Sequence, residues 1–273
     1  MSETSHLHNE AIEMLRDTSR TFFIPITHLP ERLKEAVTGA YLCMRAIDEV
    51  EDHPELPADD KVKLLRSISE TLQGESYKDE LAAIFKNYKH ILPEVSLRLH
   101  DWITVCPKEA LRNVLDSTST MADGMASWVE KNFDIQTKKD LDDYTYYVAG
   151  LVGVMLSDLW KWYDNIETDK ELAIAFGRGL QSVNILRNRD EDLDRDEVDF
   201  FPNGWGWDEM FRYARKNLAM ADQYMESINN EKIQHFCQIP LALAHATLDA
   251  IAEGKEKISR TEVHDIVNKV VNE

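Results

Sequence analysis

Apolar residues recur along this chain at intervals of three and four positions, with polar residues between them. This spacing places them on one face of an α-helix, whereas a half-buried strand would show strict alternation. The pattern predicts helices over residues 6–17, 31–52, 59–73, 77–90, 107–132, 138–165, 169–194, 207–227, 229–253 and 259–272. The expected fold class is therefore all-α.

Local signals support several of these helix starts. Pro107 stands where a first-turn proline is tolerated, and Thr168 with Glu171 has the spacing of a capping box. The chain has 273 residues, of which 43% are apolar, and no linker rich in Pro, Gly or Ser divides it. Such a chain can bury a substantial core, so we predict one helical bundle domain over residues 1–273.

The charge balance excludes one class of partner. The chain carries 31 basic and 50 acidic residues, for a formal charge of −19. Nucleic acids attract clustered Lys and Arg, so a nucleic-acid partner is not expected.

Membrane insertion and secretion are not expected either. The longest apolar runs are shorter than the roughly 20 residues of a membrane span or carry polar residues, although a lipid-like substrate could bring the protein transiently to a membrane for product release. The three cysteines, Cys43, Cys106 and Cys237, are scattered in apolar stretches, and no signal peptide is recognisable. These features predict a reduced, cytoplasmic protein.

A polar stripe crosses the predicted helix over residues 31–52. Its members are spaced by 4, 3 and 4 residues, and they are Tyr41, Arg45, Asp48 and Asp52. Their side chains therefore line one helical face, with the two aspartates about 6 Å apart along the axis. In an acidic protein such a pair is more often a solvated surface than a metal site, and Arg45 could be an ordinary ion-pair partner.

A second polar stripe lies on the predicted helix over residues 169–194. Its members are spaced by 3, 4 and 4 residues, and they are Gln181, Asn184, Asn188 and Asp192. Amide side chains along a largely apolar helix are costly unless they have partners. Two such stripes in one bundle indicate a shared polar cavity.

The residue types in the two stripes point to a divalent cation. Facing carboxylates repel each other and gain protons unless a cation lies between them. Mg²⁺ takes oxygen ligands, usually one or two carboxylates plus a substrate phosphate, and Arg45 and Arg187 would suit a diphosphate. A di-iron bundle needs a Glu-x-x-His from each of two helices, and the terminal Glu3 and His6 alone have that spacing. We therefore set the di-iron alternative aside.

Motifs in the chain resemble the squalene/phytoene synthase family, the head-to-head prenyl synthases. Four match in order, and they are SRTFF at 19–23, YLCMRAIDEVED at 41–52, YYVAGLVGVMLS at 146–157 and QSVNILRNRDED at 181–192. The weaker GMA at 124–126 and HFCQIPLALAHATL at 235–248 are more similar to the squalene synthase side of the family. The resemblance implies an isoprenoid (terpenoid) synthase fold whose central cavity takes farnesyl diphosphate.

The resemblance also implies a role for individual residues. Metal ligands would be Asp48, Asp52, Asn188 and Asp192. Residues that bind or position the diphosphate would be Ser19, Arg20, Tyr41, Arg45, Gln181, Asn184 and Arg187. Tyr146 and Tyr147 fall where the family has a catalytic tyrosine, and Asp48, Asp52 and Asp192 would share in catalysis. Residues that line the pocket for the prenyl tail would be Phe22, Val148, Gly150, Leu151 and Phe236.

The expected chemistry is ionisation of an allylic diphosphate. Metal ions and arginines stabilise the departing diphosphate, because negative charge develops there. A dry apolar pocket then holds the carbocation. Capture by a second prenyl chain gives a C30 product, whereas capture by water gives farnesol.

The chain departs from the family pattern near its second aspartate motif. Asn188 replaces an aspartate, so one negative charge is lost, and a charge contact at about 4 Å is of order 4 kcal/mol before desolvation offsets it. Glu197 and Asp199 stand where the family usually has a basic residue and a tyrosine. This reversed charge beside a diphosphate site is unfavourable for a synthase. The alternative is a solvated loop whose charge has no effect on the site.

Three functional hypotheses follow from these departures. The leading one is a magnesium-dependent hydrolase, a farnesyl diphosphate phosphatase that releases farnesol and diphosphate. The first alternative is a transferase that condenses two farnesyl diphosphates to a C30 product of the squalene or dehydrosqualene type, with NADPH as hydride donor for squalene. The second is an inactive helical protein that binds prenyl diphosphates.

Overall fold

The protein is all-helical. The computed structural model describes residues 3–19, 21–75, 77–196, 198–255 and 258–272, and within these ranges every regular element is a helix. The predicted fold class is confirmed. The chain divides into two compact units, Met1–Lys131 and Asn132–Glu273. The prediction of a single domain stays a prediction.

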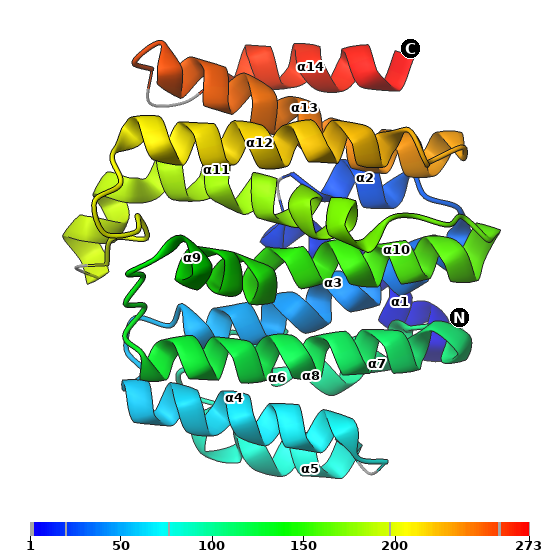
Figure 1. Cartoon of the computed structure of the whole chain (residues 1–273). Helices are drawn as coiled ribbons and strands as arrows, with labels where there is room; N and C mark the ends of the chain where they lie inside the picture. The colour runs from blue at the N-terminus through cyan, green and yellow to red at the C-terminus, as the bar shows by residue number, and fades with distance from the viewer. Residues whose placement is uncertain (1–2, 20, 76, 197, 256–257, 273) are drawn as a thin grey trace. The chain divides into compact units, whose positions relative to one another are not determined.

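The first unit is built around α3. Its helical segments are α1 (Glu3–Thr18), α2 (Phe23–Thr27), α3 (Glu31–Glu51), α4 (Ala58–Gln73), α5 (Tyr77–Ile84), the 3₁₀-helix η1 (Phe85–Tyr88), α6 (Glu94–Leu97), α7 (Leu99–Val105) and α8 (Lys108–Glu130). Helix α3 packs against α1, α6, α7 and α8, and α4 lies beside α8 (Figure 1). This packing leaves the polar stripe of α3 as the less buried side of a largely buried helix.

The second unit is organised by α11. Its segments are α9 (Lys138–Thr145), the π-helix η2 (Tyr146–Gly150), α10 (Leu151–Asp164), α11 (Lys170–Asp196), α12 (Trp207–Met225), α13 (Glu231–Ala252) and α14 (Arg260–Asn272). Helix α11 contacts α9, η2, α10, α12 and α13, and it runs beside α12 in Figure 1. Its first turn is capped by Asp169, whose carboxylate accepts from the backbone of Glu171 and Leu172 at 2.8 and 3.1 Å. The predicted cap at Thr168 is thus displaced by one residue.

Two of the predicted helices are divided in the structure, and three short helices were not predicted. The expected helix over 138–165 is interrupted by the π-turn η2, and the expected helix over 77–90 becomes α5 followed by η1. Helices α2, α6 and α7 were not predicted, because four to seven residues are too few to establish a periodicity. Cys106 ends α7 as its C-cap rather than lying inside a helix, and all three cysteines are free and buried.

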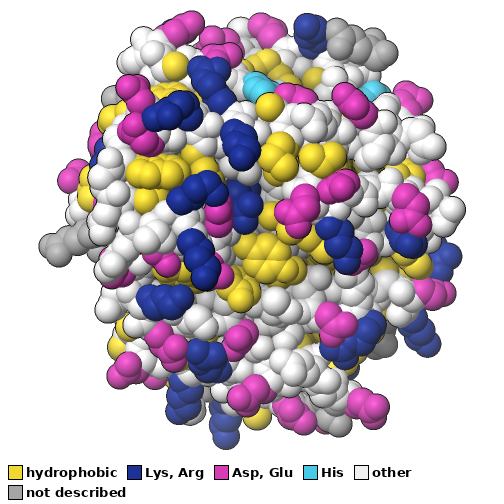
Figure 2. Space-filling view, in the orientation of Figure 1, with side chains coloured by type: hydrophobic (Ala, Val, Ile, Leu, Met, Phe, Trp, Pro, Cys, Tyr) yellow, Lys and Arg dark blue, Asp and Glu magenta, His cyan; other side chains and the backbone are white. Residues whose placement is uncertain are grey.

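Helix length, apolar character and surface charge relate to the earlier expectations about membranes and nucleic acids. No helix in the described part of the chain is both long and apolar enough to cross a bilayer. On the face shown in Figure 2, Lys and Arg side chains gather in places, with Asp and Glu side chains beside and around them.

Candidate active site

The polar stripe of α3 forms a connected cluster. Arg45 donates to Asp48 Oδ2 at 2.7 Å and also pairs with Glu49, which was not among the predicted site residues. Tyr41 donates its hydroxyl proton to the backbone oxygen of Thr18 at 3.0 Å, which ties the stripe to α1. Arg45 and Asp48 of the predicted stripe are thus hydrogen-bonded to each other within the first unit, and the roles of all four residues stay predictions.

The electrostatics of Asp48 are those of a carboxylate that lacks sufficient positive charge. Burial, then the Asp52 carboxylate, raises the pKa of Asp48 to about 7, even though the Arg45 guanidinium lowers it and the side chain is 33% exposed. Asp52 caps the C-terminus of α3 and is exposed. A cation beside both carboxylates would relieve this repulsion, and oxygen donors of this type fit Mg²⁺.

One hydrogen-bond donor of Arg45 is unpaired among the described residues. Its two terminal nitrogens are occupied by Asp48 and Glu49, but its Nε is buried and has no hydrogen-bond partner among the described residues. A buried unpaired N–H is costly, so this atom is suited to an incoming anion.

The structure describes four of the five residues of the SRTFF motif. Ser19 is 4% exposed, and its hydroxyl oxygen accepts the backbone N–H of Phe22 at 2.9 Å. The rings of Phe22 and Tyr41 lie 6.3 Å apart between centroids. Arg20 falls outside the described residues. Ser19 therefore organises the start of α2, and its predicted contact with diphosphate stays a prediction.

The polar stripe of α11 is half-buried. One hydrogen bond joins two of its residues, and a second joins it to the neighbouring Arg187. Asn184 Nδ2 lies 3.5 Å from Gln181 Oε1, and Arg187 Nε donates to Asn188 Oδ1 at 3.0 Å. Arg187 is exposed, whereas Gln181, Asn184, Asn188 and Asp192 are all half-buried. The amide oxygen of Asn188 is thus presented as an acceptor, which is the atom that a metal ligand would use.

The reversed charge after α11 is neutralised inside the second unit. Arg189 Nη2 donates to Asp199 Oδ2 at 2.7 Å, and its guanidinium lies over the Phe201 ring at 3.9 Å from the centroid. Asp199 also accepts the backbone N–H of Phe201 at 3.1 Å. Arg189 therefore packs against the loop that follows α11, and Asp199 stabilises that loop by accepting from both Arg189 and the Phe201 backbone. Glu197 falls outside the described residues.

The two candidate catalytic tyrosines lie on the π-turn η2. The Leu151 N–H reaches the Tyr146 carbonyl, five residues earlier, and the rings of Tyr146 and Tyr147 meet edge to face at 5.3 Å. Both side chains and Val148 are half-buried, whereas Gly150 and Leu151 are buried. π-turns are rare, and they occur frequently at functional sites.

Gly177 brings α11 into backbone contact with the π-turn. A Cβ at Gly177 would lie 2.1 Å from the Ala149 carbonyl oxygen and 2.9 Å from the Gly150 nitrogen. Similarly, a Cβ at Gly153 would lie 2.0 Å from the Ala173 carbonyl oxygen. These glycines permit an approach that no larger residue allows without backbone movement.

Gly177→Ala is expected to destabilise the protein by about 2 kcal/mol or more, because an overpacked backbone contact cannot relax through a rotamer change. Urea unfolding would measure the loss. Gly206→Ala is the matched control, since its Cβ would meet only the Glu209 carboxylate at 3.5 Å; there the cost is expected to stay below about 1 kcal/mol. Equal losses in the two variants would contradict the close approach.

Phe236 behaves as a core residue. It is 3% exposed and packs edge to face against Trp160, with ring centroids 5.4 Å apart. Its predicted place in the wall of a tail pocket stays a prediction. Among the described residues, no group of three or more His, Cys, Asp and Glu side chains could hold a metal ion by itself. Any Mg²⁺ site here would therefore take further ligands from amide oxygen, water or substrate.

Comparison with known sequences decides the family. Residues 15–205 match the sequence model of the family described as squalene/phytoene synthase. The chain belongs to this family. It is 32% identical to the squalene synthase of Schizosaccharomyces pombe, over 88% of this chain and 58% of that protein. It is 31% identical to a squalene synthase of Botryococcus braunii, over 86% and 57% respectively. The chain thus spans a little over half the length of these relatives.

Solved structures of the family share the fold. A TcSQS structure with a bound ligand aligns with a TM-score of 0.79 at 24% identity, over 97% of this chain and 86% of that one. A dehydrosqualene synthase in complex with a ligand aligns with a TM-score of 0.61 at 19% identity, over 99% and 97%. The expected isoprenoid synthase fold is confirmed.

These relatives correct the leading functional hypothesis. The similar curated proteins are squalene synthases, so the prediction of a farnesyl diphosphate phosphatase, and with it the hydrolase and farnesol assignments, was wrong. Both departures from the family pattern have a local compensation. The charge of Asp199 is balanced by Arg189, and Asn188 keeps an oxygen that can ligate a cation.

Proposed function

We propose that this protein is a head-to-head prenyl synthase that joins two farnesyl diphosphates into a C30 hydrocarbon of the squalene type. The observation that carries the proposal is the identity of 32% to a squalene synthase across 88% of the chain. The cluster on α3 supports it, because it combines paired carboxylates with an arginine that has an unpaired buried donor. Each assignment below is part of the proposal.

In the first unit, Asp48 and Asp52 would hold Mg²⁺ and Arg45 would bind the diphosphate. The bound metal would stabilise negative charge on the departing diphosphate. Arg45 would add a charge-assisted hydrogen bond from Nε while its terminal nitrogens keep Asp48 and Glu49 in place. Ser19, Arg20 and Tyr41 would complete the diphosphate contacts of this unit.

In the second unit, Asn188 and Asp192 would provide oxygen ligands to Mg²⁺. Gln181 and Asn184 would donate amide N–H groups to diphosphate oxygens, and the exposed Arg187 would exchange its bond with Asn188 for one with the diphosphate. This exchange would free the Asn188 oxygen for the metal at the moment when the anion arrives.

The two tyrosines of the π-turn would stabilise the carbocation. Tyr146 and Tyr147 place phenol rings and hydroxyls on one half-buried surface beside the apolar Val148. Aromatic faces stabilise a nearby cation. A hydroxyl that passes its own proton to the departed diphosphate can accept the proton that a coupling step releases. Leu151 and Phe236 would exclude water around a prenyl chain in the second unit, and Phe22 would do so in the first. NADPH would supply a hydride if the product is squalene rather than dehydrosqualene.

The purified protein, incubated with farnesyl diphosphate and Mg²⁺, is expected to form a C30 hydrocarbon that extracts into hexane. Adding NADPH is expected to change the product to the more reduced hydrocarbon, which gas chromatography with mass spectrometry would show. Chelation of the metal by EDTA should stop the reaction, because the diphosphate would then leave without charge stabilisation. A C15 alcohol as the dominant product, or no turnover, would overturn the proposal.

A further inference from the structure

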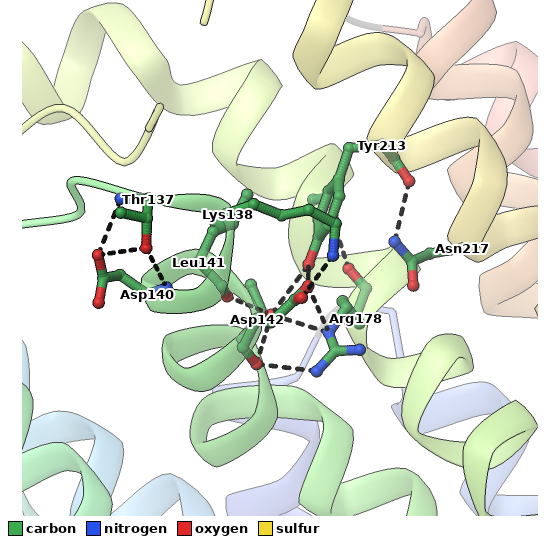
Figure 3. A network of polar contacts seen from close by, with 10 residues as sticks. Thr137, Lys138, Asp140, Leu141, Asp142, Arg178, Tyr213 and Asn217 are labelled. Carbon is green, nitrogen blue, oxygen red and sulfur yellow. Dashed lines mark hydrogen bonds and ion pairs between the residues drawn. The ribbon is translucent and has the colours of Figure 1, made fainter. Parts of the chain in front are cut away.

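A partly buried polar network lies at the junction of α9 and the π-turn, and neither the motifs nor the proposed function includes it. It consists of Asp142, Thr145, Arg178 and Tyr213, called here the Arg178 network (Figure 3). These residues come from α9, α11 and α12. The network thus joins three helices of the second unit.

Arg178 contacts the end of α9 at two acceptors. Its Nε donates to Thr145 Oγ1 at 3.1 Å, and its Nη2 donates to the backbone oxygen of Asp142 at 2.8 Å. Thr145 donates its own proton to the Leu141 carbonyl at 2.6 Å, so its oxygen is left to accept from Arg178. A planar guanidinium can serve two such acceptors at once, whereas a lysine ammonium is a compact point charge.

The Asp142 carboxylate extends the network to α12. The Tyr213 hydroxyl donates to Asp142 Oδ1 at 2.7 Å, and Lys138 forms an ion pair with the other oxygen. Burial raises the pKa of Tyr213 well above its ordinary value, so its hydroxyl keeps the proton that it donates. Arg178 Nε lies 3.8 Å from the same carboxylate, and the Arg178 side chain is only 18% exposed.

The network adjoins the residues of the π-turn. Tyr146 N–H is directed at the carbonyls of Asp142 and Asp143, and the former is the acceptor that Arg178 also contacts. At the other end of the turn, Gly177 lies against the Ala149 carbonyl. Two consecutive residues of α11 therefore lie at the two ends of the segment that carries both tyrosines. Gly177 contacts its last residues, and Arg178 contacts the end of α9 just before it.

We propose that Arg178 is a positioning residue that holds Tyr146 and Tyr147 in register with the polar stripe of α11. Because Gln181 is three residues beyond Arg178 on the same helix, the tyrosines and the diphosphate donors of α11 would move as one piece. This inference rests on the proposed function for its catalytic consequence. Its structural part, that Arg178 holds the π-turn, does not depend on which reaction occurs.

The expected effect falls on kcat. Displacement of a catalytic group by about 1 Å can cost about 100-fold in rate. Arg178→Gln is expected to lower kcat for C30 formation by about 10- to 100-fold, with KM for farnesyl diphosphate changed less than about threefold, because the substrate contacts proposed above are retained. Arg178→Lys should recover part of the loss, since it keeps the charge but not the two-point contact.

The chain offers a matched control for lost stability. Tyr213 and Tyr224 both lie on α12, both are buried, and each makes a hydrogen bond with its hydroxyl, to Asp142 Oδ1 at 2.7 Å and to Ser157 Oγ at 2.8 Å. Tyr213→Phe and Tyr224→Phe therefore remove equivalent groups, but only the first belongs to the Arg178 network. We expect similar falls in Tm and a fall in kcat for Tyr213→Phe alone.

Hydrogen exchange followed by mass spectrometry separates the structural part from the reaction. Arg178→Gln and Tyr213→Phe are expected to raise amide exchange at least tenfold in peptides covering residues 144–152, while Tyr224→Phe leaves those peptides unchanged. Unchanged exchange at these amides in Arg178→Gln would overturn the proposal, whatever the activity. Faster exchange with normal kcat would also overturn it. If the wild-type protein makes no C30 product, the proposed function fails, and the exchange result still decides whether Arg178 holds the turn.

Discussion

Asp48→Asn is expected to abolish C30 formation, with kcat falling by at least about 1,000-fold, a loss of the size seen when a main electrostatic stabiliser is removed. The substitution keeps the shape of the side chain but removes the negative charge that would hold Mg²⁺. It also releases Arg45, which now donates to Asp48 Oδ2 at 2.7 Å. Turnover of farnesyl diphosphate under saturating Mg²⁺ is the measurement.

Two controls separate the loss of the metal ligand from a loss of folding. Asp59→Asn changes an exposed aspartate in the first turn of α4 and should leave turnover unchanged. In addition, Asp48→Asn should not lower Tm at pH 8 without metal, because it removes a carboxylate that Asp52 repels. Wild-type turnover in a folded Asp48→Asn variant would show that the metal site was assigned to the wrong residues.

Magnesium affinity is expected to rise as pH rises to about 7 and then to level off. Burial, then the neighbouring Asp52, raises the pKa of Asp48 from 3.8 to about 7. Below the raised value the carboxyl is protonated, and Mg²⁺ must displace that proton to bind. One displaced proton makes the affinity change about tenfold per pH unit well below the pKa, so binding at pH 5 should be about 50-fold weaker than at pH 7.

The stability of the metal-free protein should change in the opposite direction. Between the ordinary pKa of 3.8 and the raised value near 7, the unfolded state has lost the Asp48 proton while the folded state keeps it. Since the folded state then binds more protons, its stability falls as pH rises through this window. Thermal unfolding at pH 5 and pH 8, with and without Mg²⁺, measures both effects. A magnesium affinity that does not vary between pH 5 and 7 would contradict the assigned ligand.

The loop after α11 shows why a local departure from a family pattern is weak ground for a change of function. Asp199 is acidic where a different residue was expected, but Arg189, ten positions earlier, accounts for it through an ion pair. Read singly, Asp199 predicted an unfavourable charge beside diphosphate. Read as a pair, the two residues close the loop against the Phe201 ring. The charge is therefore largely balanced before any substrate binds.

The sequence by itself determined most of the longer helices and the two polar stripes, since both depend on contacts between residues three or four positions apart. The predicted starts and ends of α3, α8, α12 and α14 agree with the structure to within two residues. The ordered motifs also sufficed to identify the family. Periodicity did not reveal Glu49 as the second partner of Arg45, although an acid four residues beyond an arginine could have indicated it.

Only the tertiary structure revealed the π-turn and the residues that hold it. Arg178 meets Asp142 and Thr145 across 36 and 33 positions of the chain, and Tyr213 meets Asp142 across 71. No local pattern encodes such pairings, because they depend on how α9, α11 and α12 pack. The π-turn itself adds one residue to a helical turn, which periodicity over 138–165 averages away. The contacts of Gly177 with the turn and of Arg178 with the end of α9 arise from that packing alone.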